Sequence, residues 1–230
     1  MLTKSPKILS SFRTNGYFLA QSVFPIKEMA ACKLEAKLLI EKQTGPSGVF
    51  VWMYDNIPPL FESISCDPRL LSILKTLIGS KIEFLSAKPV FKSSEVYFAS
   101  PWHQDQAYWG GATMYSCWIA LEETTPQNGC LRVIPGSHQK YRNHSAVEDV
   151  NGFTNRITNN DLKTETILDI PMKCGDVLVF HDQLLHSSYA NSSGKDRWSF
   201  IPTYRNADIP DTSTVWSMSK LINFNREKPE

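Results

Sequence analysis

The most constraining feature of this sequence is a series of short segments rich in β-branched and aromatic residues, separated by strong turn sequences, that begins near residue 81. We expect strands at 82–90, 94–99, 113–121, 130–134, 164–170, 176–180 and 197–204. The turns include Pro126-Gln127-Asn128-Gly129, Pro135-Gly136-Ser137, Lys173-Cys174-Gly175 and Asn191-Ser192-Ser193-Gly194. Many short strands at fairly even spacing favour a β-barrel or jelly roll over a series of βαβ units.

The first eighty residues, in contrast, predict helices with short breaks. Residues 26–43 carry apolar side chains among Lys and Glu at helical spacing. A second helix has Asp67 as its N-cap and Pro68 at its first position, and Gly79 ends it. We therefore expect one domain over 1–230, with helical support at 1–80 and a barrel or jelly-roll core at 81–206.

A long stretch from 139 to 163 is polar and poorly periodic. Irregular connections of this length are uncommon in compact domains, and those that occur often have a functional role. We therefore expect this stretch to be a lid loop over the mouth of the barrel.

Composition limits the partners and the compartment. The formal net charge is +1 and the basic residues are scattered, so no field attracts nucleic acid or an anionic membrane. No segment approaches the length of a membrane-spanning helix. The five cysteines include no C-x-x-C pair, which favours a reducing, cytoplasmic setting. We expect a small-molecule partner, no nucleic acid or membrane, and a monomer or homodimer.

The segment His103-Gln104-Asp105, followed at long range by a further histidine, points to a metal centre. Two imidazoles and one carboxylate are the ligand set of mononuclear non-haem Fe(II) sites, which keep positions open for chemistry. A strand places residues i and i+2 on one face, so His103 and Asp105 would point into the barrel together. His-x-Asp alone is a weak signal, and two later histidines, His181 and His186, compete as the third ligand.

Arg197 follows His186 by eleven residues and begins the strand expected at 197–204. On a neighbouring strand it would face the same cavity, where its guanidinium could hold a dicarboxylate through two parallel hydrogen bonds. The alternative is a surface arginine at the start of a strand.

Taken in order, these segments resemble the phytanoyl-CoA dioxygenase (PhyH) family of Fe(II)/2-oxoglutarate oxygenases, over most of the chain from Phe12 to about Arg205. The resemblance rests on Trp102-His103-Gln104-Asp105, Cys117-Trp118-Ile119-Ala120-Leu121, the stretch from Asn128-Gly129 to Ser137-His138, and the stretch from Gly175-Asp176 to Arg197. It implies a mainly β fold: a double-stranded β-helix (jelly roll, cupin-like) with N-terminal helices packed outside. It also implies Fe(II), 2-oxoglutarate as co-substrate and O₂, with ascorbate as a reductant.

Carried over by residue, the resemblance implies that His103, Asp105 and His186 bind iron. The spacing to Asn191 and Arg197 favours His186 over His181. Arg197 would pair with the distal carboxylate of 2-oxoglutarate, assisted by Ser188. The positions that would line the co-substrate pocket are Trp118, Gln104 and Lys88, of which Trp118 can equally be core packing.

The reaction implied is hydroxylation of an unactivated C–H bond with release of succinate and CO₂, or a desaturation or cyclisation variant. Asp105 occupies the coordination position that related halogenases leave for chloride, so halogenation is disfavoured. Candidate substrate-binding residues, each of which can instead be ordinary core, are Tyr97, Trp102, Tyr108, Trp109, Arg132, Tyr204 and Arg205.

An aromatic pocket with Arg132 would suit a small molecule with an acidic group, either amino-acid-like or a natural-product intermediate. The competing function is a cupin-like metalloprotein, either an isomerase or a non-catalytic binding module. Arg197 with Ser188 discriminates between the two, because only a 2-oxoglutarate user needs them.

Overall fold

A computed structural model of the chain describes residues 5–40, 48–148, 153–158, 162–213, 215–216 and 218–222. The helices are α1 (Ser5–Asn15), α2 (Ile26–Ile40), α3 (Pro59–Ser65), α4 (Pro68–Ile78), α5 (Gln106–Trp109) and the 3₁₀ turn η1 (Ser137–Gln139). The strands are β1 (Tyr17–Ala20), β2 (Trp52–Met53), β3 (Ile82–Lys92), β4 (Met114–Ala120), β5 (Leu131–Val133), β6 (Ser145–Ala146), β7 (Asn155–Arg156), β8 (Leu168–Ile170), β9 (Val177–His181), β10 (His186–Ser188), β11 (Arg197–Asn206) and β12 (Lys220–Ile222).

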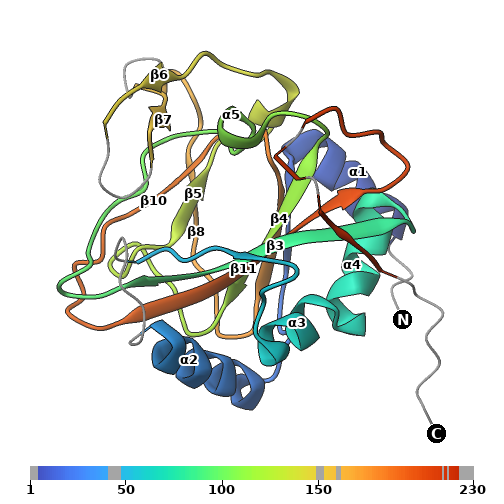
Figure 1. The fold of residues 1–230 in the computed structure, drawn as a ribbon. Helices are drawn as coiled ribbons and strands as arrows, with labels where there is room; N and C mark the ends of the chain where they lie inside the picture. The colour runs from blue at the N-terminus through green and yellow to red at the C-terminus, as the bar shows by residue number, and fades with distance from the viewer. Residues whose placement is uncertain are drawn as a thin grey trace, which may run out of the picture.

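The strands form two main antiparallel sheets. The larger has the order β1-β9-β4-β11-β3-β12, with β2 also paired to β3, and the smaller has the order β10-β5-β8. A cluster of buried side chains drawn from both sheets, including Trp118, Leu131, Ile170 and Leu178, packs between them. Two antiparallel sheets that face one another over a shared core form the expected jelly roll, which does not close into a barrel (Figure 1).

The period of two along the strands decides which side chains face the inside of the jelly roll. On β11, Trp198 and Phe200 point to a second core against the helices, while Arg197 and Ile201 line the inner cavity. On β4, Cys117 and Ile119 pack toward the helices and Trp118 packs between the sheets. The strand alternation therefore brings polar groups from the larger sheet to a cavity inside the fold.

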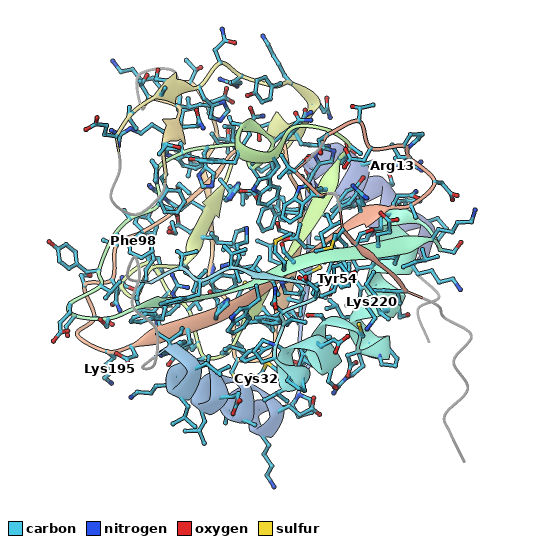
Figure 2. The ribbon with its side chains drawn as sticks, in the orientation of Figure 1. Arg13, Cys32, Tyr54, Phe98, Lys195 and Lys220 are labelled. Atoms are coloured by element: carbon cyan, nitrogen blue, oxygen red, sulfur yellow. The ribbon has the colours of Figure 1, made fainter. Side chains whose placement is uncertain are left out.

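Helices α2, α3 and α4 cover the outer face of the larger sheet, opposite the β6–β7 hairpin (Figure 1). Side chains fill the space between them, and the Cys32 side chain lies on α2 at the side of this sheet (Figure 2). In α4 the Asp67 carboxylate accepts a hydrogen bond of 2.8 Å from the Arg69 N–H, Pro68 opens the helix, and Gly79 ends it with φ 104°. The expected caps of this helix are confirmed.

Several expectations about the secondary structure were wrong. The stretch 94–99 is not a strand, because the Ser93 hydroxyl accepts hydrogen bonds from the Glu95 and Val96 N–H groups and closes a turn after β3. The first eighty residues are not all helical, since β1 pairs with β9 and β2 with β3. The strand expected at 164–170 is shortened to β8, and β10 and β12 were not expected.

Two expectations fall partly outside the described residues. Helix α2 ends at Ile40, and residues 41–43 of the expected helix lie in an undescribed range. The expected lid at 139–163 contains the short β6–β7 pair, while 149–152 and 159–161 are not described. Across the described parts of the chain, no helix has both the length and the apolar character needed to cross a membrane.

Candidate metal centre

The backbone itself holds His103 and His186 together. The two residues form an isolated antiparallel bridge in which each N–H donates to the other's carbonyl oxygen at 3.1 Å. Their ring centroids lie 4.2 Å apart. His186 is the first residue of β10, so the bridge joins the His103 segment to the edge of the smaller sheet.

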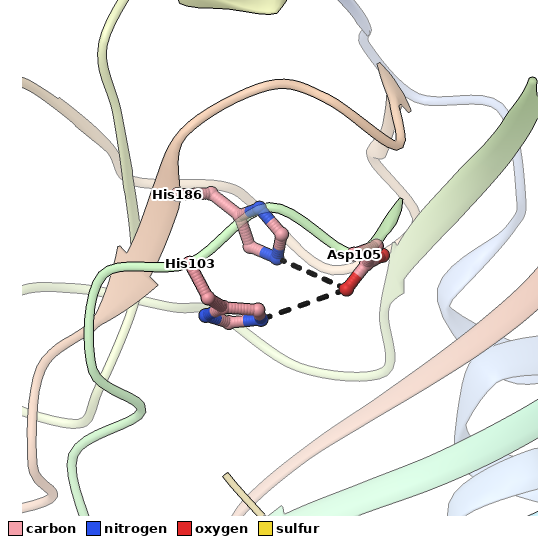
Figure 3. A group of neighbouring side chains, drawn as sticks. All are labelled: His103, Asp105 and His186. Atoms are coloured by element: carbon pink, nitrogen blue, oxygen red, sulfur yellow. Dashed lines mark ion pairs between the residues drawn. The ribbon is translucent and has the colours of Figure 1, made fainter. Parts of the chain in front are cut away.

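Both imidazoles are oriented by a hydrogen bond on the far side of the ring. His103 Nδ1 lies 2.7 Å from the Pro101 carbonyl oxygen, and His186 Nδ1 lies 2.9 Å from the Leu184 carbonyl oxygen. Because a carbonyl oxygen can only accept, each Nδ1 carries the proton, and the lone pair is on Nε2. The two Nε2 atoms lie 3.5 and 3.7 Å from the same oxygen of Asp105 (Figure 3).

Asp105 reaches this position in a way that differs from the sequence argument. We expected His103 and Asp105 to share one face of a strand, but Asp105 has helical backbone angles (φ −57°, ψ −32°) immediately before α5. The chain turns after the bridge, and the Ala107 N–H bonds back to the Gln104 carbonyl oxygen. The second carboxylate oxygen accepts a hydrogen bond of 3.3 Å from the Ser116 hydroxyl on β4.

The three groups fit a divalent metal ion in charge as well as in geometry. All three side chains are buried, and their candidate ligand atoms lie within 4.8 Å of one another. Burial lowers the pKa of His186 to about 4, with a further contribution from His103, so this imidazole is neutral at pH 7. Burial alone would raise the pKa of Asp105, but His186 and His103 hold it below its ordinary value. Two neutral nitrogens and one carboxylate are a donor set that suits Fe(II).

A cavity of about 110 Å³ adjoins these three residues. Apolar side chains, among them Phe98, Phe153 and Phe180, form much of its wall. The polar groups that line it beyond the three candidate ligands are Lys88, Lys92, Ser100, Ser116, Ser188 and Arg197. The cavity is therefore a small, largely apolar space with a few charged groups directed into it, as small-molecule sites are.

Arg197 lies in this cavity and is only 1% exposed, so the alternative of a surface arginine is wrong. Its guanidinium donates to the Ser199 hydroxyl at 2.9 Å and to the Gly129 carbonyl oxygen at 3.1 Å, and it lies 5.3 Å from the centroid of the Trp118 ring. We expected it on a strand neighbouring His186. Instead β11 belongs to the larger sheet, so Arg197 reaches the cavity from the sheet opposite β10.

Ser188, Trp118 and Lys88 line the same cavity, as expected. Trp118 does so while also packing in the core between the sheets. Lys88 places its ammonium group 4.4 Å from the centroid of the Trp109 ring. Burial lowers the pKa of Lys88, and Asp105 opposes this effect.

Gln104 does not line the cavity. Its amide donates to the carbonyl oxygens of Lys140 at 3.0 Å and Gln183 at 2.6 Å, and its carbonyl accepts from the Arg142 N–H at 2.9 Å. With its neighbours on either side directed to the metal centre, Gln104 points the other way and fastens the 140–142 segment. The structure therefore does not bring Gln104 to this cavity with the other residues expected in the co-substrate pocket.

Most of the expected substrate residues lie elsewhere. Trp102 packs in a separate core cluster, Arg132 stacks on Trp102 and Tyr189, and Tyr97 is 62% exposed. Tyr204 donates its hydroxyl to the Ser65 carbonyl oxygen on the helix side of the larger sheet, and Arg205 pairs with Glu83 and Asp211. Sequence proximity to a motif does not set side-chain direction, and none of these five residues lines the cavity beside the candidate ligands.

Tyr108 and Trp109 lie close to the cavity without lining it. The Tyr108 ring meets His103 edge-on at 5.8 Å, and its hydroxyl donates to the Asn155 carbonyl oxygen at 2.6 Å. Trp109 contacts Lys88, which lines the cavity. His181 is outside the cavity, with its ring against Tyr115 and His138.

The structure adds cavity residues that sequence reasoning missed, of which Lys92 is the most informative. It is buried at the end of β3, on the same face as Lys88 and Val90. The period of two from Lys88 could have identified it, because a lysine at an inward position of a strand is rare unless it has a partner or a ligand.

Comparison with known proteins agrees with this arrangement. The sequence profile of the phytanoyl-CoA dioxygenase (PhyH) family matches residues 12–199. The chain is 27% identical over 191 residues to a phytanoyl-CoA dioxygenase of Arabidopsis thaliana, covering 81% of this chain and 67% of the relative. It is 24% identical over 234 residues to an ectoine dioxygenase of Bordetella bronchiseptica, covering 87% of this chain and 75% of the relative.

The chain spans 67%, 60% and 51% of the length of three curated relatives from Arabidopsis thaliana, Danio rerio and Oryza sativa. Among solved structures, the epimerase SnoN in complex with Fe³⁺, α-ketoglutarate and nogalamycin RO has a TM-score of 0.77 at 20% identity, covering 89% of this chain and 84% of that one. At this identity the likeness shows the shared jelly-roll fold.

Proposed function

The chain belongs to the phytanoyl-CoA dioxygenase (PhyH) family of Fe(II)/2-oxoglutarate-dependent oxygenases, and we propose that it hydroxylates an unactivated C–H bond of a small, amino-acid-like or natural-product molecule. The observation that carries this proposal is one cavity lined by two imidazoles, one carboxylate and a buried guanidinium. A cupin-like isomerase or a non-catalytic module would give no account of the guanidinium.

In this proposal His103 and His186 bind Fe(II) through Nε2, and Asp105 binds it through a carboxylate oxygen. The Nδ1 hydrogen bonds to the Pro101 and Leu184 carbonyl oxygens keep both rings in the ligating orientation. When bound, iron and 2-oxoglutarate together supply the oxidation of a C–H bond by O₂, with release of succinate and CO₂. The protein's own contribution is to orient the substrate and to exclude water from this space.

Arg197 is the group that binds the distal carboxylate of 2-oxoglutarate. Burial lowers its pKa to about 10, so it stays charged at pH 7 in a place where its charge has no carboxylate contact among the described residues. A buried cation without an anionic partner is costly, and a bound carboxylate removes that cost. Ser188, on the facing sheet, lines the same space.

The substrate follows from the cavity's size and its remaining charge. About 110 Å³ favours a small molecule, and the Lys88 ammonium group beside the metal centre would bind an acidic group on it. Relatives named ectoine dioxygenase and L-proline trans-4-hydroxylase support an amino-acid-like compound. Lys88 therefore takes the role that we expected of Arg132.

The test is turnover of 2-oxoglutarate with a panel of amino acids and cyclic amino acid derivatives. The Fe(II) protein should form succinate slowly alone and faster with a substrate, which should gain the mass of one oxygen atom. His186→Ala should abolish both products, while His138→Ala, a histidine outside the cavity, should retain them. Absence of succinate from the wild-type protein under all conditions would contradict the proposal.

A further inference from the structure

Two basic side chains lie opposite each other inside the fold. Arg197 of β11 and Lys92 of β3 are direct partners in the antiparallel register, and each is only 1% exposed. Like charges placed directly opposite on paired strands destabilise a sheet, and burial increases the cost. The folded protein must therefore offset the free-energy cost of placing these two side chains together.

No carboxylate forms an ion pair with either residue in the described parts of the chain, although Glu122 favours the charged form of Arg197 from a longer distance. Lys92 Nζ donates to the Ser188 hydroxyl at 2.7 Å and to the Tyr189 carbonyl oxygen at 2.5 Å. Arg197 donates to the Ser199 hydroxyl and the Gly129 carbonyl oxygen, and its Nε has no partner in the described parts of the chain. No ion pair reaches either residue within the described ranges. Both side chains line the cavity that adjoins the three candidate metal ligands.

The surroundings are shaped to admit the Lys92 side chain. A Cβ on Gly129 would lie 2.8 Å from Lys92 Cδ and 2.8 Å from the Tyr189 carbonyl oxygen, so only glycine fits there. Its φ of 96° is also a conformation that glycine adopts readily. The same Gly129 supplies the carbonyl oxygen that holds Arg197. One residue thus makes room for Lys92 and orients its neighbour.

We infer that Lys92 is a second cation of the co-substrate site, so that Lys92 and Arg197 together bind the distal carboxylate of 2-oxoglutarate. Ser188 positions Lys92, and this gives the expected helper residue a specific role. The inference rests on the proposed function, since it assigns a further residue to the same dicarboxylate. A single carboxylate shared by two buried cations compensates both at once.

The electrostatics add a measurable consequence. Burial is the main cause that lowers the pKa of Lys92 to about 6; Arg197 on β11 and Arg132 on β5 contribute to the lowering, and Cys130 opposes it. Burial raises the pKa of the Cys130 thiol to about 11, so it carries no charge near pH 7. The other acidic or basic side chains that line the cavity are Lys88, His103, Asp105 and His186. Without a ligand Lys92 is therefore mostly neutral at pH 7.5, and an arriving carboxylate favours its protonated form.

The experiment is calorimetric titration of 2-oxoglutarate into the Ni(II)-loaded protein, in which no turnover occurs, in two buffers of different ionisation enthalpy at pH 7.5. The wild-type protein should take up close to one proton per bound 2-oxoglutarate. The affinity of the wild-type protein for 2-oxoglutarate should fall about tenfold per pH unit above pH 7. Binding takes up one proton, and the proton concentration falls tenfold with each unit. Lys140→Met, at an exposed lysine, should behave as wild type.

Two substitutions at Lys92 distinguish an effect of its charge on 2-oxoglutarate binding from an effect of its side chain on the structure. Lys92→Met should lose the proton uptake and the pH dependence, and should bind 2-oxoglutarate at least tenfold more weakly at pH 6.5. Lys92→Arg keeps a permanent charge, so it should bind without proton uptake and with little dependence on pH. Binding by wild type and Lys92→Met with equal affinity and equal proton uptake would overturn the inference and leave the proposed function intact. If the wild-type protein binds no 2-oxoglutarate, the proposed function falls and this inference falls with it.

Discussion

His103 and His186 exchange both of their backbone hydrogen bonds across a single bridge, each at 3.1 Å. The candidate metal centre is therefore built by pairing of the main chain between two distant segments, and the imidazoles are fixed before any metal arrives. Asp105 completes the group from the helical turn that follows. Because the backbone bridge fixes both histidines at the edge of the smaller sheet, the centre is pre-organised for a metal ion.

Metal binding should stabilise the folded protein. A ligand at one hundred times its Kd adds about 2.7 kcal/mol to the free energy of unfolding. Chemical denaturation with and without Ni(II) measures this increment. It should vanish in His186→Ala and Asp105→Ala, and should survive in His138→Ala. An equal increment in all four proteins would place the metal elsewhere.

Arg197→Ala should separate co-substrate binding from metal binding. Loss of a charge-assisted hydrogen-bonded pair costs about 1.5–3 kcal/mol, so 2-oxoglutarate affinity should fall by roughly ten- to one-hundredfold. The affinity for Ni(II), measured in the same preparation, should change little. Arg197→Lys is the matched control and should recover only part of the loss, because it lacks the planar fork. Unchanged 2-oxoglutarate affinity in Arg197→Ala would remove Arg197 from the site.

Lys92→Met should make the ligand-free protein more stable than wild type near neutral pH, because it removes a buried amine beside Arg197. The folded-state pKa of Lys92 is about 6, below the ordinary 10.5 of the unfolded chain. Between these values the unfolded state holds more protons, so wild-type stability rises with pH, by up to about 1.4 kcal/mol per unit. Urea unfolding at pH 6.5, 7.5 and 8.5 should show this slope in wild type and a smaller one in the variant. Equal slopes would show that Lys92 is charged in the folded protein.

Gln104→Ala should remove hydrogen bonds that hold the 140–142 segment and leave the affinity for 2-oxoglutarate nearly unchanged. The substitution removes three hydrogen bonds that this buried amide makes to main-chain groups. Stability should fall by about 1–3 kcal/mol, and the Arg142 amide should exchange its hydrogen faster. The Kd for 2-oxoglutarate should stay within about threefold of wild type, that is within about 0.7 kcal/mol. A larger loss of affinity with unchanged exchange would restore Gln104 to the pocket.

The sequence was sufficient to predict a barrel or jelly roll, because many short segments of β-branched and aromatic residues are separated by turn residues, and the family resemblance favoured the jelly roll. It also predicted the caps of α4, which depend on local chemistry at Asp67, Pro68 and Gly79. The three candidate metal ligands and Arg197 were likewise named from spacing and family resemblance, and they line one cavity.

What could not be predicted was side-chain direction next to irregular backbone. Asp105 leaves the strand period because the chain turns into α5, and this turn directs Gln104 away from the site. Tyr204 and Arg205 follow a β-bulge between Thr203 and Tyr204, where the register shifts. Lys92 was missed for the opposite reason: it obeys the alternation, but it falls at the end of β3, outside every motif.

The central claim is that His103, Asp105 and His186 hold Fe(II) where 2-oxoglutarate can chelate it. Anaerobic titration of the metal-free protein with Fe(II) and then with 2-oxoglutarate tests this directly. The account predicts a weak visible metal-to-ligand charge-transfer band that appears with 2-oxoglutarate and is absent in His186→Ala. Tight Fe(II) binding by the wild-type protein with no such band at saturating 2-oxoglutarate would contradict it.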